Sequence, residues 1–197
     1  MEKRHRIFLA INLPEDIKKE LAKYESKYAE LPAKWTAKDN LHITLEFLGD
    51  LTDQEIGDVC QIAKETAKFH NSFSINLKKI LYGPKEYLKE KNRIPKMIWA
   101  EGESCQDLLN MKKDLQNRLL EKVRFKPEQR RFLPHITLAR ISSWEFKKME
   151  PEEIPDVSEN IDLIFTVESI EVMESELKKE GPRYTVLDSH ELKVDKI

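Results

Sequence analysis

The chain has 197 residues, of which 40% are hydrophobic, and its 34 basic side chains nearly balance 36 acidic ones, leaving a net charge of −2. This length and composition argue against a disordered chain and favour a globular domain with a sizeable core. The near balance also excludes a global basic field, so any attraction for nucleic acid must come from a local patch.

Neither the cysteines nor the N-terminus indicates an exported protein. Cys60 and Cys105 are far apart, without CxxC spacing or a neighbouring histidine, and we interpret both as reduced thiols of a cytoplasmic protein. The first sixteen residues contain only a short apolar run between charges, which is typical of a strand rather than a signal peptide. The sequence has no apolar stretch long enough to cross a membrane, and no obligate protein partner is implied.

The first elements predicted along the chain are a strand, a helix and a second strand. Residues 6–12 are apolar enough for a buried strand, and Pro14 has the fixed φ that suits a first helical turn. Apolar residues then recur at helical spacing from Ile17 to Tyr28. Residues 40–48 predict the next strand, with Gly49–Asp50 as its end.

A second helix and two further strands are predicted next. Thr52 and Glu55 form a capping-box pair, and an apolar stripe continues from there to Ala67. Residues 73–81 and 96–100 predict strands on either side of a polar connection.

In the last third of the chain, a helix is expected from about Ser104, followed by a strand over 133–141. Residues 150–160 form an acidic, proline-punctuated linker, the least ordered-looking part of the sequence. Two closing strands are expected over 163–173 and 183–192. Helices that alternate with strands before a closing strand pair indicate an α+β or mixed α/β domain.

A repeated histidine motif is the strongest signal in the sequence. His42-Ile43-Thr44-Leu45 recurs letter for letter as His135-Ile136-Thr137-Leu138, and both copies fall in predicted strands. Because successive strand side chains point to opposite faces, each His should project together with its Thr, roughly 6.6 Å apart along the strand. A single copy would be read as chance on a solvent face. Two copies favour a functional pair, and the alternative is an ancient duplication retained for packing.

The chain resembles the 2H phosphoesterase superfamily, and specifically the RNA 2′,3′-cyclic phosphodiesterases once called 2′-5′ RNA ligases. The resemblance spans nearly the whole chain. It rests on five ordered segments: Arg6–Ile11, Asn40–Gly49, Pro134–Arg140, Val167–Ile170 and Gly181–Leu187. It implies an α+β, bilobed fold with pseudo-two-fold symmetry, formed by residues 1–197 as a single domain. Antiparallel sheets would line a central cleft, with helices outside.

The resemblance also implies roles for individual residues. His42 would be the proton donor and His135 the proton acceptor, and RNA ends or nucleotide 2′,3′-cyclic phosphates would be converted to 2′-phosphates. Arg140 matches a family arginine that contacts phosphate. Strict strand alternation places Arg140 on the face opposite His135, so a bulge, the strand twist or the strand end must bring it round.

The chemistry explains why two histidines are needed. A base must deprotonate water on one side of phosphorus and an acid must protonate the departing oxygen on the other, and imidazole suits both tasks. Thr44 and Thr137 would donate hydrogen bonds to the non-bridging phosphate oxygens. No cofactor or metal is needed for these steps. Glu46, expected on the face of His42, leaves a metal there conceivable.

Other residues carry weaker expectations. Tyr184 is the best aromatic candidate for contact with a base or ribose, while Trp35, Trp99 and Phe47 are more typical of a core. Arg130 and Arg131, with Lys126 just before the second motif, are candidates for contact with the RNA backbone, as is the Lys-rich stretch 85–96. The three remaining histidines are expected to be solvated or to cap elements: His5, His70 and His190.

Two further functions stay open at the level of the sequence. One is a 2H reaction on a small cyclic nucleotide, which would use the same catalytic pair. The other is a non-catalytic nucleotide-binding module, like the 2H domain of certain A-kinase anchoring proteins. Substrate profiling separates the first from RNA-end hydrolysis, and two intact motifs argue against the second.

Overall fold

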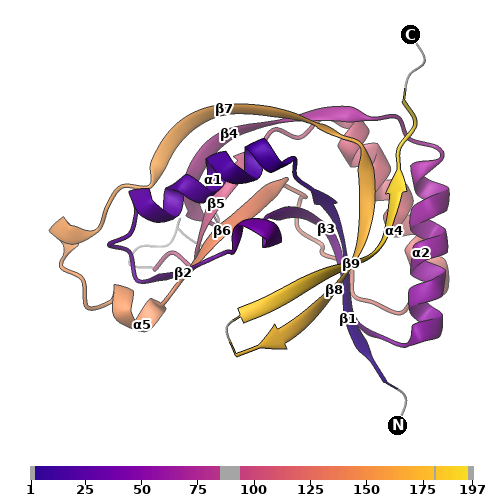
Figure 1. Ribbon diagram of the computed structural model, residues 1–197, viewed down its shortest axis with the longest axis horizontal. Helices are drawn as coiled ribbons and strands as arrows, with labels where there is room; N and C mark the ends of the chain where they lie inside the picture. Colours follow the sequence, from indigo (N-terminus) through magenta and orange to yellow (C-terminus); the bar gives the residue numbers. More distant parts are fainter. Residues whose placement is uncertain (1–2, 85–93, 180, 195–197) are drawn as a thin grey trace.

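The computed structural model describes residues 3–84, 94–179 and 181–194. They form an α+β fold in which the strands make a strongly curved sheet (Figure 1). Its strands are β1 (His5–Asn12), β2 (Ala33–Trp35), β3 (His42–Leu51), β4 (Phe73–Gly83), β5 (Met97–Gly102), β6 (His135–Ile141), β7 (Ser158–Val167), β8 (Ser169–Lys178) and β9 (Gly181–Glu191). The helices are α1 (Glu15–Lys27), α2 (Asp53–Ala67), α4 (Gln106–Lys122) and α5 (Ser143–Phe146), with 3-10 turns η1 (Lys38–Asn40) and η2 (Pro151–Glu153).

The described strands form one antiparallel sheet in the order β7-β4-β5-β6-β3-β1-β8-β9, with β2 paired to β6 beside this path. The order is symmetric about the junction of β6 and β3, where Ile43 pairs with Ile136. Each half contributes four strands, and the histidine strands are the innermost pair. The antiparallel α+β fold is confirmed, although the sheet is continuous rather than divided. A single bilobed domain over the whole chain stays a prediction.

The buried hydrophobic side chains form two clusters of very unequal size, one on each side of the sheet. Ile7, Leu9 and Ile11 of β1 point into the main core, where fully burying such a side chain stabilises the fold by roughly 1.5–3 kcal/mol. Phe8 and Ala10, which alternate with them, belong to a second small cluster on the opposite face. Helices α2 and α4 lie side by side on the outside (Figure 1).

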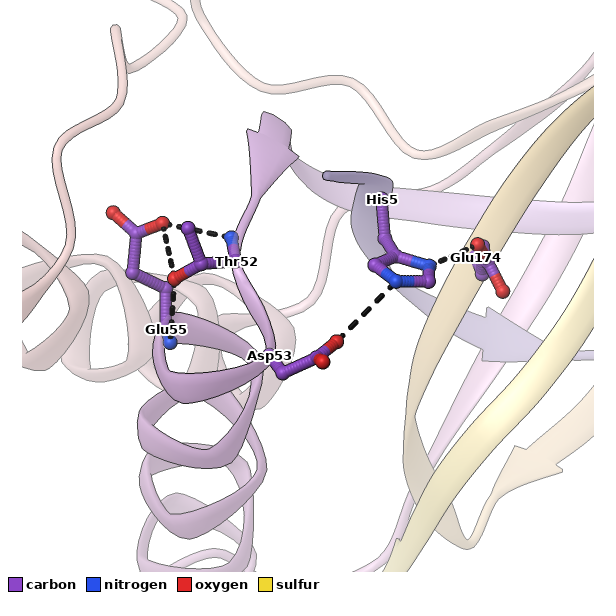
Figure 2. A network of polar contacts seen from close by, with 5 residues as sticks. All are labelled: His5, Thr52, Asp53, Glu55 and Glu174. Atoms are coloured by element: carbon purple, nitrogen blue, oxygen red, sulfur yellow. Dashed lines mark hydrogen bonds and ion pairs between the residues drawn. The ribbon is translucent and has the colours of Figure 1, made fainter. Parts of the chain in front are cut away.

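The start of α2 follows the predicted capping box (Figure 2). The Thr52 hydroxyl accepts a hydrogen bond from the Glu55 amide at 3.3 Å, and the Thr52 amide donates to the Glu55 carboxylate at 2.8 Å. Two orphan amides of the first helical turn are thereby satisfied. The same figure shows His5 between Asp53 and Glu174, at 3.3 and 2.5 Å.

These contacts correct the expectation for the three remaining histidines. The side chain of His5 is only 14% exposed and clips β1 to both β8 and α2. His70 lies 3.1 Å from a carboxylate oxygen of Asp114, and His190 lies 3.0 Å from one of Asp188. His5 and His70 hydrogen-bond to acids and His190 lies close to one, and all three side chains are largely buried instead of solvated.

The predicted strand over 163–173 is wrong as one element. It is two strands that break at Glu168, because β7 pairs with β4 while β8 pairs with β1 on the other half of the sheet. The chain therefore crosses between halves at this residue (Figure 1). Part of the acidic linker is also ordered, as η2 and the first residues of β7.

The predicted stop at Gly49–Asp50 is also wrong, since β3 runs on to Leu51. Gly49 has φ of +82°, a conformation that glycine adopts without strain, and it sits at a register shift against β1. The turn signal therefore marks a bulge. Of the Lys-rich stretch, residues 85–93 lie outside the described part of the chain. No helix within the described ranges is both long and apolar enough to traverse a bilayer.

Candidate active site

The two repeated motifs lie on neighbouring strands in the middle of the sheet. Antiparallel pairing at Ile43 and Ile136 sets His42 opposite Thr137 and Thr44 opposite His135. The isoleucines are fully buried in the main core, whereas the His and Thr side chains are half-buried on the opposite face. We call the face with these four polar side chains the histidine face. Residues 93 positions apart are thus brought together by one pair of strands.

Both imidazoles are held in the same way. His42 Nδ1 lies 2.7 Å from the Asn40 carbonyl, and His135 Nδ1 lies 2.9 Å from the Leu133 carbonyl. A carbonyl can only accept, so each Nδ1 carries the proton that it donates. On each ring, Nε2 is therefore the nitrogen that is left able to gain or lose a proton. His42 Nε2 lies 3.0 Å from the Thr44 hydroxyl.

Aromatic rings pack against each imidazole. The rings of Phe8 and Tyr184 lie 5.0 and 5.2 Å from that of His42, with Tyr184 edge-on. On the other half, the Trp99 ring stacks on His135 with centroids 4.0 Å apart. Trp99 is only 8% exposed, so its ring is a buried support for the His135 imidazole. Tyr184 thus lies beside the motif in β3, and its contact with substrate stays a prediction.

The pKa of His42 is lowered from its ordinary value. Burial is the largest cause, because desolvation disfavours the charged ring, and the Asn40 carbonyl partly opposes it. The positive charges of Lys18 and His135 lower the pKa further. Lys18 was missed by the sequence reading. It is buried in α1 and donates to the Asp39 carbonyl at 3.4 Å, within the turn η1 whose Asn40 carbonyl holds His42.

The pKa of His135 is also lowered, again chiefly by burial. The Leu133 carbonyl and the negative charge of Glu101 raise it, while the positive charge of Arg130 lowers it. Arg130 thus lies within electrostatic reach of the motif. Its side chain is exposed and bonds Glu128 at 2.6 Å, which holds the pKa of that carboxyl near 2. Arg131 is exposed in the same segment.

Each histidine strand carries a bulge at the last residue of its motif. Against β1, the register passes from Thr44 to Glu46 and skips Leu45. Against β5, it passes from Thr137 to Ala139 and skips Leu138. The extra residue reverses the alternation of side chains in both strands at equivalent positions.

The bulge in β6 decides where Arg140 points. Cross-strand pairing sets Thr137 opposite Trp99 and Arg140 opposite Met97, and those two partners share one face. The Met97 sulfur lies 4.0 Å from the Thr137 hydroxyl and 3.6 Å from Arg140 Nη1. Arg140 is therefore on the histidine face, which removes the objection from strict alternation.

The bulge in β3 has the opposite consequence for Glu46. The expectation that Glu46 shares a face with His42 is wrong. Its side chain is 4% exposed beneath α4, where Lys112 Nζ lies 3.0 Å and Gln116 Nε2 3.3 Å from the carboxylate. Phe47 instead reaches the histidine face, is 62% exposed and lies 6.0 Å from Phe8. Its exposure differs from the core position expected of it.

Comparison with known proteins agrees with this arrangement. Residues 11–91 and 102–184 match the family model described as LigT like Phosphoesterase. The chain is 30% identical over 182 residues to the RNA 2′,3′-cyclic phosphodiesterase of Methanocaldococcus jannaschii, covering 92% of this chain and 98% of that protein. It is 30% identical over 194 residues to that of Thermus thermophilus, covering 95% and 90%.

Solved structures give the same answer for the fold. TT0787 of Thermus thermophilus superposes with a TM-score of 0.80 at 28% identity, covering 97% of this chain and all of that one. LigT of E. coli, solved with 3′-AMP, superposes with a TM-score of 0.75 at 23% identity, covering 96% and 99%. The shared fold, the two histidine strands and the match over most of the sequence place this chain in the LigT-like phosphoesterase family.

Proposed function

We propose that this protein hydrolyses the 2′,3′-cyclic phosphate ends of RNA to terminal 2′-phosphates, with His42 and His135 as its acid–base pair. The observation that carries the proposal is the repeated geometry on the histidine face. Two imidazoles from adjacent strands are each fixed through Nδ1, leaving Nε2 for proton transfer. The names of its relatives, which are RNA 2′,3′-cyclic phosphodiesterases, support the substrate.

The proton movements follow from these roles. His135 Nε2 accepts a proton from the water that attacks phosphorus. The bond between phosphorus and O3′ breaks, and protonated His42 Nε2 donates its proton to that oxygen. The product carries a phosphate monoester on O2′. Each group supplies on the order of 10²- to 10⁴-fold in rate.

Hydroxyl groups on the same face would stabilise the developing charge, and cationic and aromatic groups around them would hold the RNA. Thr44 and Thr137 are proposed to donate hydrogen bonds to the non-bridging oxygens, and Arg140 to contact phosphate through its guanidinium fork. Tyr184 would contact the base or ribose, and Arg130 and Arg131 the RNA backbone. Both proton transfers are assigned to histidines, so the reaction is expected to proceed without a divalent metal.

The same site would also support weak joining of RNA ends. If the 5′-hydroxyl of a second RNA takes the place of water, it loses its proton to His135 and attacks phosphorus, the bond to O3′ breaks with a proton from His42, and a 2′-5′ linkage forms. Hydrolysis of small cyclic nucleotides and binding without catalysis are the competing functions, and the substrates and variants below separate them.

The test incubates purified protein with oligoribonucleotides ending in 2′,3′-cyclic phosphate in the presence of EDTA. We expect a 2′-phosphate product, identified by chromatography against both isomers. His42→Ala and His135→Ala should each lower kcat by at least about 10²-fold, whereas His70→Ala, whose ring bonds Asp114 among the outer helices, should keep activity. Full activity in either motif variant would refute the assigned roles. A requirement for added divalent metal would overturn the mechanism.

A further inference from the structure

Two cations face each other across β2 and β6. Lys34 pairs directly opposite Arg140, and both side chains are exposed. Like charges at directly opposed positions destabilise a sheet. In the described part of the chain neither cation forms an ion pair with an acid. The guanidinium of Arg140 donates a hydrogen bond to the Met97 sulfur, which is a weak acceptor. Such a pair is electrostatically suited to an anion.

The pair also borders a cavity of about 460 Å³. Residues 31–34 of the segment entering β2 form one side, and residues 140–142 at the end of β6 form the other. Glu145 of α5 lines the cavity without an ion pair to either cation among the described residues. The two cations therefore have a hollow next to them that a ligand can enter.

The tip of the β8–β9 hairpin fixes the position of Lys34. A Cβ atom at Gly181, whose φ is +139°, would lie 3.1 Å from Lys34 Nζ, so the ammonium packs directly against this glycine. The next residue, Pro182, accepts a hydrogen bond from Asn40 Nδ2 at 2.9 Å. Two positions further on, Tyr184 contacts the His42 ring. Lys34 is thus joined to the histidine face by the same hairpin.

Along β6, the motif and the cationic pair are consecutive. His135, Thr137 and, because of the bulge, Arg140 follow one another on one face, with Lys34 beside Arg140. A chain whose cyclic end lies at the histidines would bring its next charged group to this part of the sheet. In RNA that group is the neighbouring phosphodiester.

We propose that Lys34 and Arg140 form a second phosphate subsite, which binds the internal phosphodiester next to the cyclic end of an oligoribonucleotide. The inference rests on the proposed function, since it assumes that the cyclic end occupies the histidine face. Arg140 supplies a planar fork and Lys34 a point charge, a combination suited to phosphate oxygens. A cyclic mononucleotide has no such group, so the subsite selects oligonucleotides.

The test compares three substrates in EDTA: adenosine 2′,3′-cyclic phosphate, a hexaribonucleotide ending in cyclic phosphate, and the same hexamer with its last internal phosphodiester replaced by a neutral methylphosphonate. The wild-type protein should favour the charged hexamer over the methylphosphonate by roughly tenfold in kcat/KM, as for loss of a charged hydrogen bond. Lys34→Gln should abolish most of this difference and Lys34→Arg should keep it. Lys64→Gln removes the same charge from the outer helix α2 and should change nothing.

Binding gives a readout that does not depend on turnover. In the His135→Ala background, the affinity for the labelled hexamer, measured by fluorescence anisotropy, should fall with salt. Lys34→Gln should flatten the slope of log K against log salt by about 0.7, the value for one phosphate contact on a single strand. An unchanged slope together with an unchanged methylphosphonate effect would overturn the subsite while leaving hydrolysis intact. Absence of hydrolysis in the wild-type protein, with the slope change present, would refute the proposed function alone.

Discussion

Replacing Gly83 by alanine should displace the ring that supports His135. A Cβ atom at Gly83 would lie 2.4 Å from Trp99 Cδ2 and 2.7 Å from two neighbouring ring carbons, where ordinary contact begins at 3.4 Å. The indole must therefore move by about 1.0 Å, from 2.4 to 3.4 Å. Because Trp99 stacks on His135 at 4.0 Å, the imidazole is displaced with it.

The expected magnitudes differ for stability and for catalysis. Overpacking of this kind costs about 1–3 kcal/mol of unfolding free energy, which urea denaturation measures. A displacement of about 1 Å at a catalytic group costs about 10²-fold in rate, measured as kcat on the cyclic-phosphate hexamer. We therefore expect Gly83→Ala to fold but to turn over substrate about a hundredfold more slowly.

Gly102→Ala, at the end of the neighbouring strand β5, is the matched control. Its Cβ atom would lie 3.2 Å from Ile75 Cγ2, so the neighbour needs to move by only a few tenths of an ångström, away from the imidazole. It should lower stability slightly and keep most of the activity. If Gly83→Ala retained wild-type kcat, or lost no more than Gly102→Ala does, the support of His135 by Trp99 would be refuted.

Three further outcomes are expected. Because the pKa values of His42 and His135 are both lowered by burial, kcat/KM should show a bell-shaped profile centred below about pH 6.5. The free energy of unfolding should also fall as the pH drops below about 6.5, because the unfolded chain protonates these two histidines at a higher pH than the folded chain does. A kcat/KM maximum above about pH 7 would contradict the lowered pKa values. Lys112→Met should lower the free energy of unfolding in urea by about 3–5 kcal/mol, because it leaves the buried Glu46 carboxylate without its cation. Replacing both Lys112 and Glu46 by leucine should cost less, and no effect of Lys112→Met would contradict a stabilising role of the pair. Gly57→Ala, in an exposed helical position with open space around it, should stabilise by about 0.5–1 kcal/mol in thermal unfolding.

Features with a local cause were predictable from the sequence. The capping box at Thr52 and Glu55 depends on residues three positions apart, and α2 begins where it predicts. The two motif strands were also predictable, because alternation over four residues places each His and its Thr on the same face of a strand. That these two strands are direct neighbours was not predicted, since their pairing depends on contacts across the sheet.

The misplaced features depend on registry between strands. A bulge is defined by the partner strand, so nothing within residues 42–48 shows that Leu45 is skipped or that Glu46 turns toward the helices. The break at Glu168 is similar. Residues 163–173 form a continuous apolar-rich run, and only the separate partners of β7 and β8 divide it. Lys18, which follows Ile17 in the apolar stripe of α1, could have been flagged as a buried cation.

The matching bulges in β3 and β6 bear on how a symmetric frame performs an asymmetric reaction. An acid and a base related by a two-fold repeat would serve equally well if exchanged, and either ester oxygen of a cyclic phosphate could then leave. The frame differs at the residue delivered by each bulge, which is a hydrophobic ring at Phe47 and a guanidinium at Arg140. Under the proposed function, one end of the face would suit a nucleobase and the other an anion, which would favour one direction of the bound nucleotide and hence cleavage of one of the two ester bonds.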